Sequence, residues 1–154
     1  MNIEMKNWKT LDSKDKTFDF FEYQDKDWVL IIFFRGKFCG FCRKFLMKIN
    51  DNINKFNRNN IKLLAISGDS KLSAAVLKAF LFLPFPNLPD ENLKIADLFG
   101  VKTEEKDGKK FILPSLFLIN PKHEISWAFK GNNYEDFPEV ETLLEEIKKN
   151  YIVI

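Results

Sequence analysis

The feature that most constrains the fold is a continuous apolar run from Trp28 to Phe34, rich in β-branched and aromatic residues. A strand with one solvated face alternates apolar and polar residues, whereas a strand buried on both faces is an unbroken apolar run. The run therefore predicts a central strand in a sheet that is covered on both sides. It is far too short to cross a bilayer, so we expect no membrane role.

A helix and a second strand follow this run. From Cys42 to Phe56 the apolar residues recur at helical spacing, and Ile61 to Ser67 is again apolar. Ser70 is placed to cap the next helix. The apolar face of that helix is predicted to consist of Leu72, Ala75, Val76 and Ala79.

The connection that follows contains prolines that cannot continue a helix. Asp90 is predicted to cap a short helix that ends at Gly100. A polar stretch runs from Lys102 to Lys110, and its part from Lys106 to Lys110 predicts a solvated loop. The apolar tail, Tyr151 to Ile154, is expected to cover the core.

The last third predicts a β-hairpin and a closing helix. The hairpin joins Phe111 to Ile119 with Glu124 to Phe129, and His123 is expected to be a solvated residue of its turn. Pro138 suits the first turn of the helix. The order of elements predicts the α/β class.

Size and charge exclude several classes of function. A chain of 154 residues is expected to form one domain over 1–154. Its 24 basic and 22 acidic residues do not provide the one-sided field that nucleic-acid binding needs, so no nucleic-acid partner is expected. The first residues do not resemble a secretory signal, which makes the cytoplasm the expected compartment.

The strongest chemical signal is the spacing of the two cysteines, Cys39 and Cys42, where the strand gives way to the helix. Unpaired N–H groups and the positive end of the dipole at a helix N-terminus favour a thiolate, and Arg43 and Lys37 add positive charge. Cys39 is expected to be the more exposed thiol, with its pKa pulled from about 8.5 toward or below 7. Cys42 is expected to be the buried partner that releases a mixed species.

Three other interpretations of the cysteine pair compete with redox chemistry. Structural zinc needs about four ligands, and two cysteines with the lone His123 cannot supply them, so no metal is expected. The pair is alternatively an inert part of the core, or a static disulfide, although a reducing compartment disfavours the latter. Redox chemistry remains the favoured interpretation, and no cofactor is predicted.

Four segments of the sequence resemble a known family. The segments are Phe33 to Arg43, Ala65 to Ser70, Leu83 to Pro86 with Ala96 to Val101, and Leu113 to Ile119. They resemble the peroxiredoxin-like branch of the alkyl hydroperoxide reductase and thiol-specific antioxidant group, within the thioredoxin superfamily. The resemblance implies a thioredoxin-like fold, with a central mixed β-sheet flanked by helices.

The resemblance also implies how a substrate is held. In thioredoxin-like proteins the proline that matches Pro114 follows a cis peptide bond beside the reactive cysteine, and the backbone before it holds an extended substrate. By analogy Leu113 and Pro114 are predicted substrate contacts, together with Gly40. Phe38 and Phe41 flank the cysteines and either form an apolar contact surface or pack inward.

The sequence differs from typical peroxiredoxins and thioredoxins at positions that affect the expected activity. Typical peroxiredoxins carry a threonine and an arginine that polarise the peroxide, and the matching positions here hold Gly36 and Pro114. Thioredoxins keep a buried aspartate before the motif, where this chain has Phe33. The first departure argues against an efficient peroxidase, and the second argues against an efficient general reductase.

The leading hypothesis is therefore an oxidoreductase that exchanges its dithiol with a protein or small-molecule disulfide, with Cys39 attacking and Cys42 resolving. The alternative is an antioxidant peroxide reductase that is recycled by thioredoxin or glutathione. A third hypothesis, from another class, is a non-catalytic redox sensor or interaction module.

Overall fold

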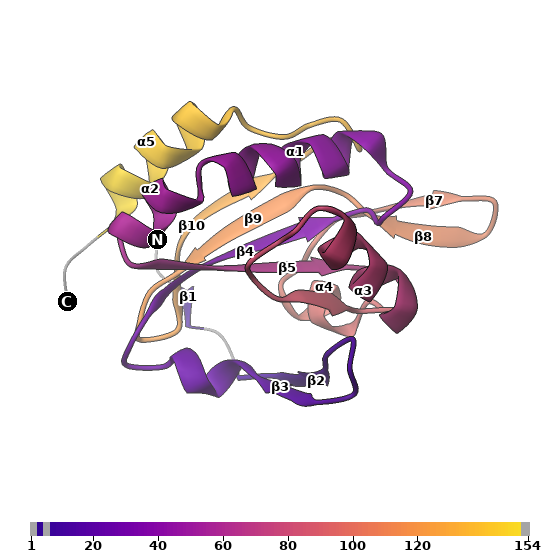
Figure 1. Cartoon of the computed structure of the whole chain (residues 1–154), viewed down its shortest axis with the longest axis horizontal. Coiled ribbons are helices and arrows are strands. Elements are labelled where there is room, and N and C mark those ends of the chain that lie inside the picture. The colour runs from indigo at the N-terminus through magenta and orange to yellow at the C-terminus, as the bar shows by residue number, and fades with distance from the viewer. Residues whose placement is uncertain (1–2, 5–6, 152–154) are drawn as a thin grey trace.

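The computed structural model of the chain describes residues 3–4 and 7–151, so residues 152–154 of the predicted core-covering tail lie outside the described part. Its centre is a six-stranded mixed sheet with the order β1-β10-β9-β4-β5-β6 (Figure 1). In that order the strands are Ile3–Glu4, Glu124–Lys130, Ser115–Ile119, Trp28–Phe34, Ile61–Ser67 and Asn87–Pro89.

Helices cover both faces of this sheet, as the thioredoxin-like prediction requires (Figure 1). One face carries α1 (Gly40–Asp51), α2 (Ile53–Arg58) and α5 (Val140–Asn150). The other carries α4 (Lys94–Leu98), the 3-10 turn η1 (Phe20–Tyr23) and an N-terminal hairpin, which the sequence analysis did not predict. The strands of that hairpin are β2 (Lys9–Leu11) and β3 (Thr17–Asp19).

The predicted central strand is confirmed. Every residue of β4 is buried, and the strand pairs in parallel with β5 and antiparallel with β9. Because successive side chains alternate, Ile32 and Phe34 face the core layer that holds both cysteines, whereas Phe33 faces the opposite layer. The comparison of Phe33 with a proton-accepting aspartate is therefore wrong, since a side chain at that position points away from Cys42.

Helix α3 (Lys71–Phe80) starts as predicted but buries a different face. The Ser70 hydroxyl caps it by accepting a hydrogen bond from the Ser73 amide at 3.2 Å. The buried residues are Ala74 and Leu77, whereas Leu72 is 75% exposed. Apolar residues occupy most sides of this helix, so spacing alone did not identify the side that meets the sheet.

A pair of substitutions tests this face. Leu77→Ala removes a side chain that is 1% exposed and should lower the free energy of unfolding by about 2–5 kcal/mol. Val76→Ala is the matched control, because Val76 is 46% exposed and its loss should cost less than about 0.5 kcal/mol. Urea unfolding of both variants measures the difference, and equal losses would contradict the observed face.

The predicted loop from Lys106 to Lys110 contains the turn of a hairpin, and the strands of that hairpin were not predicted. Its strands, β7 (Thr103–Lys106) and β8 (Lys109–Ile112), pair antiparallel and project beyond the main sheet (Figure 1). Asp107 and Gly108 both have positive φ, as a two-residue type I′ turn requires. The second predicted hairpin is confirmed as β9 and β10, although Leu113 and Pro114 separate β8 from β9.

His123 is not the solvated turn residue that was predicted. It is 2% exposed, its ring stacks on Phe20 with 4.6 Å between centroids, and its Nδ1 lies 2.7 Å from the Asn7 Oδ1. Burial lowers the pKa of His123. The turn therefore anchors the N-terminal segment to the sheet.

The remaining helix boundaries agree closely with the sequence. The Asp90 carboxylate accepts hydrogen bonds from the Ile95 and Ala96 amides, at 3.1 and 2.9 Å, and so caps α4. Gly100, with a φ of 66°, follows the end of that helix. Helix α5 begins at Val140, so Pro138 precedes it rather than occupying its first turn.

Candidate functional site

Both cysteines lie where β4 gives way to α1. Cys39 is the N-cap residue, and its Sγ accepts a hydrogen bond from the Cys42 amide at 3.3 Å. The Cys39 amide donates in turn to the Gly36 carbonyl at 3.1 Å. The loop and the first helical turn thus hold the Cys39 sulfur at the positive end of the helix.

The two thiols are both enclosed. Cys42 is 0% exposed and Cys39 is 4% exposed, and both are free thiols. Cys39 is the more accessible of the two only by this small margin, because its side chain folds back over the first turn of α1 to meet the Cys42 amide. Little of the Cys39 side chain is therefore directly accessible to a substrate.

The pKa values of the two thiols are driven apart. The pKa of Cys39 is lowered to about 6, and the hydrogen bond from the Cys42 side chain is the largest cause. The amides of Cys42 and Phe41 and the charge of Arg35 lower the pKa further, whereas burial opposes the shift. The same bond, burial and the Cys39 charge raise the pKa of Cys42. At neutral pH Cys39 is then mainly thiolate, while Cys42 keeps its proton.

Removing the Cys42 donor should weaken the acidity of Cys39. A hydrogen bond to a charged group contributes about 1.5–3 kcal/mol, so Cys42→Ala should raise the pKa of Cys39 by about one to two units. The pH dependence of iodoacetamide alkylation measures this shift. Cys42→Ser is the matched control, because its hydroxyl can still donate, and an unchanged profile in the alanine variant would contradict the assignment.

The predicted thiolate-stabilising cations hold the loop together instead. The Arg43 guanidinium donates a hydrogen bond to the Lys37 carbonyl, and the Lys37 amide donates to the Asp69 carboxylate at 2.8 Å. The charge of Lys37 acts on Asp69, whose pKa is raised by burial and lowered in part by that charge. The charge of Arg35 contributes less to the lowered pKa of Cys39 than the hydrogen bonds from Cys42 and Phe41 do.

Asp69 is a residue of the site that the sequence analysis missed. Its carboxylate lies against the motif loop, where a Cβ added to Gly36 would come within 2.8 Å of its Oδ1. Gly36 thus leaves the space that lets this carboxylate reach the Lys37 amide. No local pattern predicts this contact, because the two partners are 32 residues apart.

The backbone of Leu113 and Pro114 does not have the predicted form. The peptide bond between them is trans, not cis. The Leu113 amide donates to the Lys102 carbonyl at 3.0 Å, and the Pro114 carbonyl accepts from the Gly131 amide at 2.8 Å. Because Lys102, just before β7, and Gly131, just after β10, already bind these groups, the Leu113 amide and the Pro114 carbonyl are not free to hold an extended substrate.

The phenylalanines of the motif form an exposed surface. Phe38 is 56% exposed and Phe41 is 46% exposed, so neither ring packs fully inward. Phe38 meets the edge of Phe111, and Phe41 meets the edge of Tyr134. Gly40 is exposed between them, at the start of α1.

Arg35 is the second missed residue. Its guanidinium carbon lies 5.2, 4.7 and 5.1 Å from the ring centroids of Phe38, Phe111 and Tyr134. Together with Asp69 it lines a cavity of about 410 Å³ between the motif loop and β8. The aromatic partners come from distant segments, so the sequence did not reveal them.

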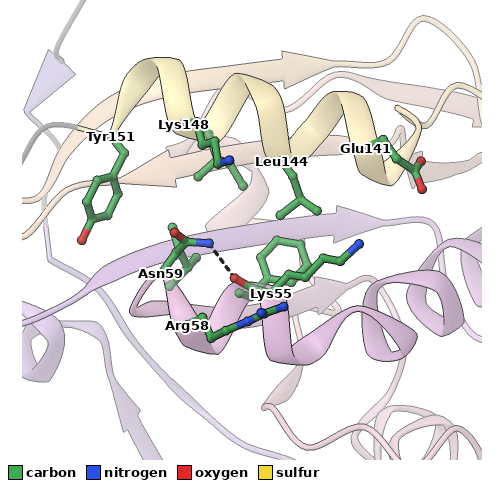
Figure 2. A pocket seen from close by; sticks show the side chains of 10 residues that line it. Lys55, Arg58, Asn59, Glu141, Leu144, Lys148 and Tyr151 are labelled. Atoms are coloured by element: carbon green, nitrogen blue, oxygen red, sulfur yellow. Dashed lines mark hydrogen bonds between the residues drawn. The ribbon is translucent and has the colours of Figure 1, made fainter.

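A larger cavity, of about 580 Å³, lies between α2 and α5. Figure 2 shows Lys55 and Arg58 on the α2 side and Leu144 on the α5 side. Neither cysteine lines it, and it lies at the opposite end of α1 from the motif (Figure 1). Neither cysteine lines the smaller cavity either, although that cavity lies beside the motif loop through Arg35 and Phe38.

Within residues 3–4 and 7–151, no three His, Cys, Asp or Glu side chains are grouped so that they could hold a metal ion. None of the helices there is long and apolar enough to span a membrane.

Comparisons with known proteins agree with this architecture. Residues 1–128 match the model of the AhpC/TSA family. Peroxidoxin BcpB from Mycobacterium tuberculosis is 16% identical, with a TM-score of 0.83 and coverage of 96% of each chain. A cysteine-to-serine mutant of PrxQ from Xylella fastidiosa is 20% identical, with a TM-score of 0.83 and coverage of 97% of this chain and 95% of that one. AhpC from Enterococcus faecalis is 16% identical, with a TM-score of 0.82 and coverage of 97% and 90%. No curated protein matches the sequence.

Proposed function

Because the chain belongs to the AhpC/TSA family, a family of thiol-dependent oxidoreductases, we propose that it reduces peroxides, with Cys39 attacking the peroxide and Cys42 resolving the product. The sequence alone favoured disulfide exchange and gave peroxide reduction as the alternative. The family match supports the alternative better, and disulfide exchange remains compatible with it.

The proposed reaction has two steps in which atoms and electrons balance. The Cys39 thiolate attacks the hydroxyl oxygen of a hydroperoxide, the O–O bond breaks, and the departing alkoxide or hydroxide takes a proton from water. Cys39 is then a sulfenic acid. The Cys42 thiol attacks its sulfur, the hydroxyl leaves as water with the Cys42 proton, and a disulfide forms. A dithiol or thiol reductant such as thioredoxin or glutathione restores both thiols.

The main support for this proposal is the difference in pKa between the two cysteines. A nucleophile must be ionised at neutral pH, and the pKa of Cys39 is lowered to about 6. A resolving thiol must stay protonated until the first step is over, and the pKa of Cys42 is raised. The pair thus supports two different roles for two neighbouring sulfurs.

Disulfide exchange is the second candidate, and the exposed rings of Phe38 and Phe41 favour it. Aromatic side chains at the rim of a reactive thiol suit a protein substrate, since such rings are enriched where proteins meet. Gly40, also exposed, lies between them in the motif. These three residues are proposed as the substrate-contacting surface in either reaction.

The deciding experiment compares two oxidants on the fully reduced protein. Stopped-flow Trp fluorescence gives the second-order rate constants for hydrogen peroxide and for oxidised glutathione. We expect the peroxide rate to exceed that of a free cysteine thiolate by about two orders of magnitude or more, the scale that one preorganised hydrogen-bond donor contributes. A peroxide rate equal to that of the free thiolate, with fast reaction of the disulfide, would assign the site to exchange instead.

A further inference from the structure

The larger of the two cavities described above has no part in the proposed reaction. It lies between α2 and α5, at the opposite end of α1 from the cysteines (Figures 1 and 2). Its volume of about 580 Å³ is within the range of about 300–1,000 Å³ that small-molecule sites span. The side chains that line it therefore need an explanation that is separate from the thiol chemistry.

The floor of this cavity is apolar. It is formed by the side chains of Phe56, Ile61 and Ile147, which are at most 3% exposed. Leu144 points from α5 into the space between the helices (Figure 2), and both Leu144 and Tyr151 are half-buried at its edge. Apolar surface that faces water is stabilised when an apolar group displaces that water. The floor therefore suits a hydrocarbon chain.

The rim of the cavity is basic. Lys55 and Arg58 come from the last turn of α2, and Lys148 comes from the last turn of α5. Among the residues that the structure describes, no salt bridge involves these three cations, and Glu141 is the one acidic residue that lines the cavity. Cations around one space repel each other, and an anion placed between them offsets that repulsion. The rim therefore suits an anionic group.

The ends of the two helices explain part of this charge. Cations are favoured near the C-terminus of a helix, and both α2 and α5 end beside the cavity. Lys149, at the same end of α5, does not line the cavity, and its Nζ lies 3.5 Å from the Glu146 carboxylate. The helix ends do not explain why three cations without acidic partners surround an apolar floor. A ligand with both an anionic and an apolar part explains the two features together.

We infer that this cavity binds a single-chain amphiphile with a carboxylate head group, such as a fatty acid. The chain lies on the buried apolar floor, and the head group meets the three cations of the rim. The Arg58 guanidinium can bind a carboxylate through two parallel N–H donors. A singly charged head group is favoured over a doubly charged phosphate, because the two helix C-termini bring partial negative charge to the same place. The inference does not depend on the proposed peroxide reduction.

A tryptophan next to the cavity provides the readout. The Trp28 ring is 4% exposed, and its centroid lies 4.6 Å from that of Tyr151, which lines the cavity. A chain that enters the cavity contacts Tyr151 and so changes the surroundings of Trp28. Trp fluorescence is titrated with dodecanoate, below the concentration at which micelles form. Dodecyltrimethylammonium has the same chain with a cationic head group, and acetate has the head group without the chain.

Dodecanoate should give a saturable change in fluorescence, with a Kd of about 1 mM or lower, the value that an ordinary ligand efficiency gives for a ligand of this size. Acetate and dodecyltrimethylammonium should give no saturable change in the same range of concentration. Added salt should weaken the binding of dodecanoate, because the cations of the rim are exposed and their charges are screened.

Substitutions on the rim locate the head group. Lys148→Gln should weaken binding of dodecanoate by up to about fivefold, the scale of one exposed ion pair. Lys149→Gln is the matched control and should not change the Kd. The triple variant with Lys55→Gln, Arg58→Gln and Lys148→Gln should weaken binding by about tenfold or more. Alkylation of Cys39 by iodoacetamide should keep its rate in the presence of dodecanoate, because the two sites are separate.

Several results would overturn the inference. They are the lack of a saturable change with dodecanoate, an equal affinity for dodecyltrimethylammonium, and equal effects of Lys148→Gln and Lys149→Gln. Protection of Cys39 by dodecanoate would place the ligand at the motif instead. A variant that ends at Tyr151 tests residues 152–154 as the occupant, since binding of dodecanoate to that variant alone would assign the cavity to the chain's own residues.

Discussion

Cys39→Ser is expected to abolish peroxide consumption, with a loss on the order of 10⁴-fold or more, the scale seen when a covalent nucleophile is removed. A serine hydroxyl remains protonated under conditions in which the pKa of Cys39 is about 6, so no strong nucleophile is left at the N-terminus of α1. Cys42→Ser should behave differently, because the attacking thiolate is retained and only the second step is lost.

Mass spectrometry after stoichiometric peroxide separates the two steps. The unmodified protein should lose two hydrogens as the disulfide forms, whereas Cys42→Ser should gain one oxygen that dimedone can trap as the sulfenic acid. Thermal unfolding of both serine variants is the control for folding. Rapid turnover by Cys39→Ser, or oxidation of Cys42 in that variant at the unmodified rate, would reverse the roles assigned to the two thiols.

Phe33→Ala is expected to cost about 3–5 kcal/mol of unfolding free energy without altering the acidity of Cys39. The ring is fully buried and lies 5.3 and 5.7 Å, between centroids, from Phe99 and Phe117 in the core layer opposite the cysteines. A cavity there removes packing and leaves the motif loop in place. Urea unfolding gives the first quantity, and the pH profile of alkylation gives the second.

Phe21→Ala is the matched control for the loss of a phenylalanine ring. Its side chain is 55% exposed on η1, so the free energy of unfolding should change by less than about 0.5 kcal/mol. A shift in the pKa of Cys39 in the Phe33 variant would show that the two faces of the sheet are coupled through β4.

The central strand of the sheet was predictable because its sequence pattern fits only one kind of structure. An unbroken apolar run such as Trp28–Phe34 has to be buried on both faces, and its burial is complete. Helix α3 was harder, because apolar residues lie on more than one side, and the face with Leu77 competes with the one that holds Leu72 and Val76. Which face meets the sheet is decided by tertiary packing, which local spacing does not encode.

The hairpin of β7 and β8 was missed for another reason. Its residues are nearly all polar and exposed, so periodicity gave no signal. The dipeptide Asp107-Gly108 was a usable signal, because Asp-Gly favours a two-residue turn with positive φ at both positions. For this hairpin the residues of the turn are therefore a better predictor than hydrophobic periodicity.

The candidate site also has one part that the sequence predicts and one part that it does not. The spacing of Cys39 and Cys42 at a strand-to-helix junction predicted a lowered pKa for the first thiol, since a helix N-terminus acts locally. Arg35 and Asp69 act through contacts with residues remote in sequence, such as Phe111 and Lys37. Those contacts exist only once the sheet has assembled, so a linear pattern does not reveal them.

The pairing of β4 has a consequence for biosynthesis. Leu30 pairs with Leu118 on β9, and β9 is made long after the motif, yet it contributes Leu116 and Leu118 to the cluster that encloses both thiols. A nascent chain that ends before β9 therefore leaves one edge of β4 open and Cys39 outside its finished environment. The hydrogen bonds that lower the pKa of Cys39 come from Cys42 and Phe41, so its acidity should be present as soon as α1 forms. Acidity and enclosure of this thiol therefore arise at different stages of synthesis, and the second requires β9.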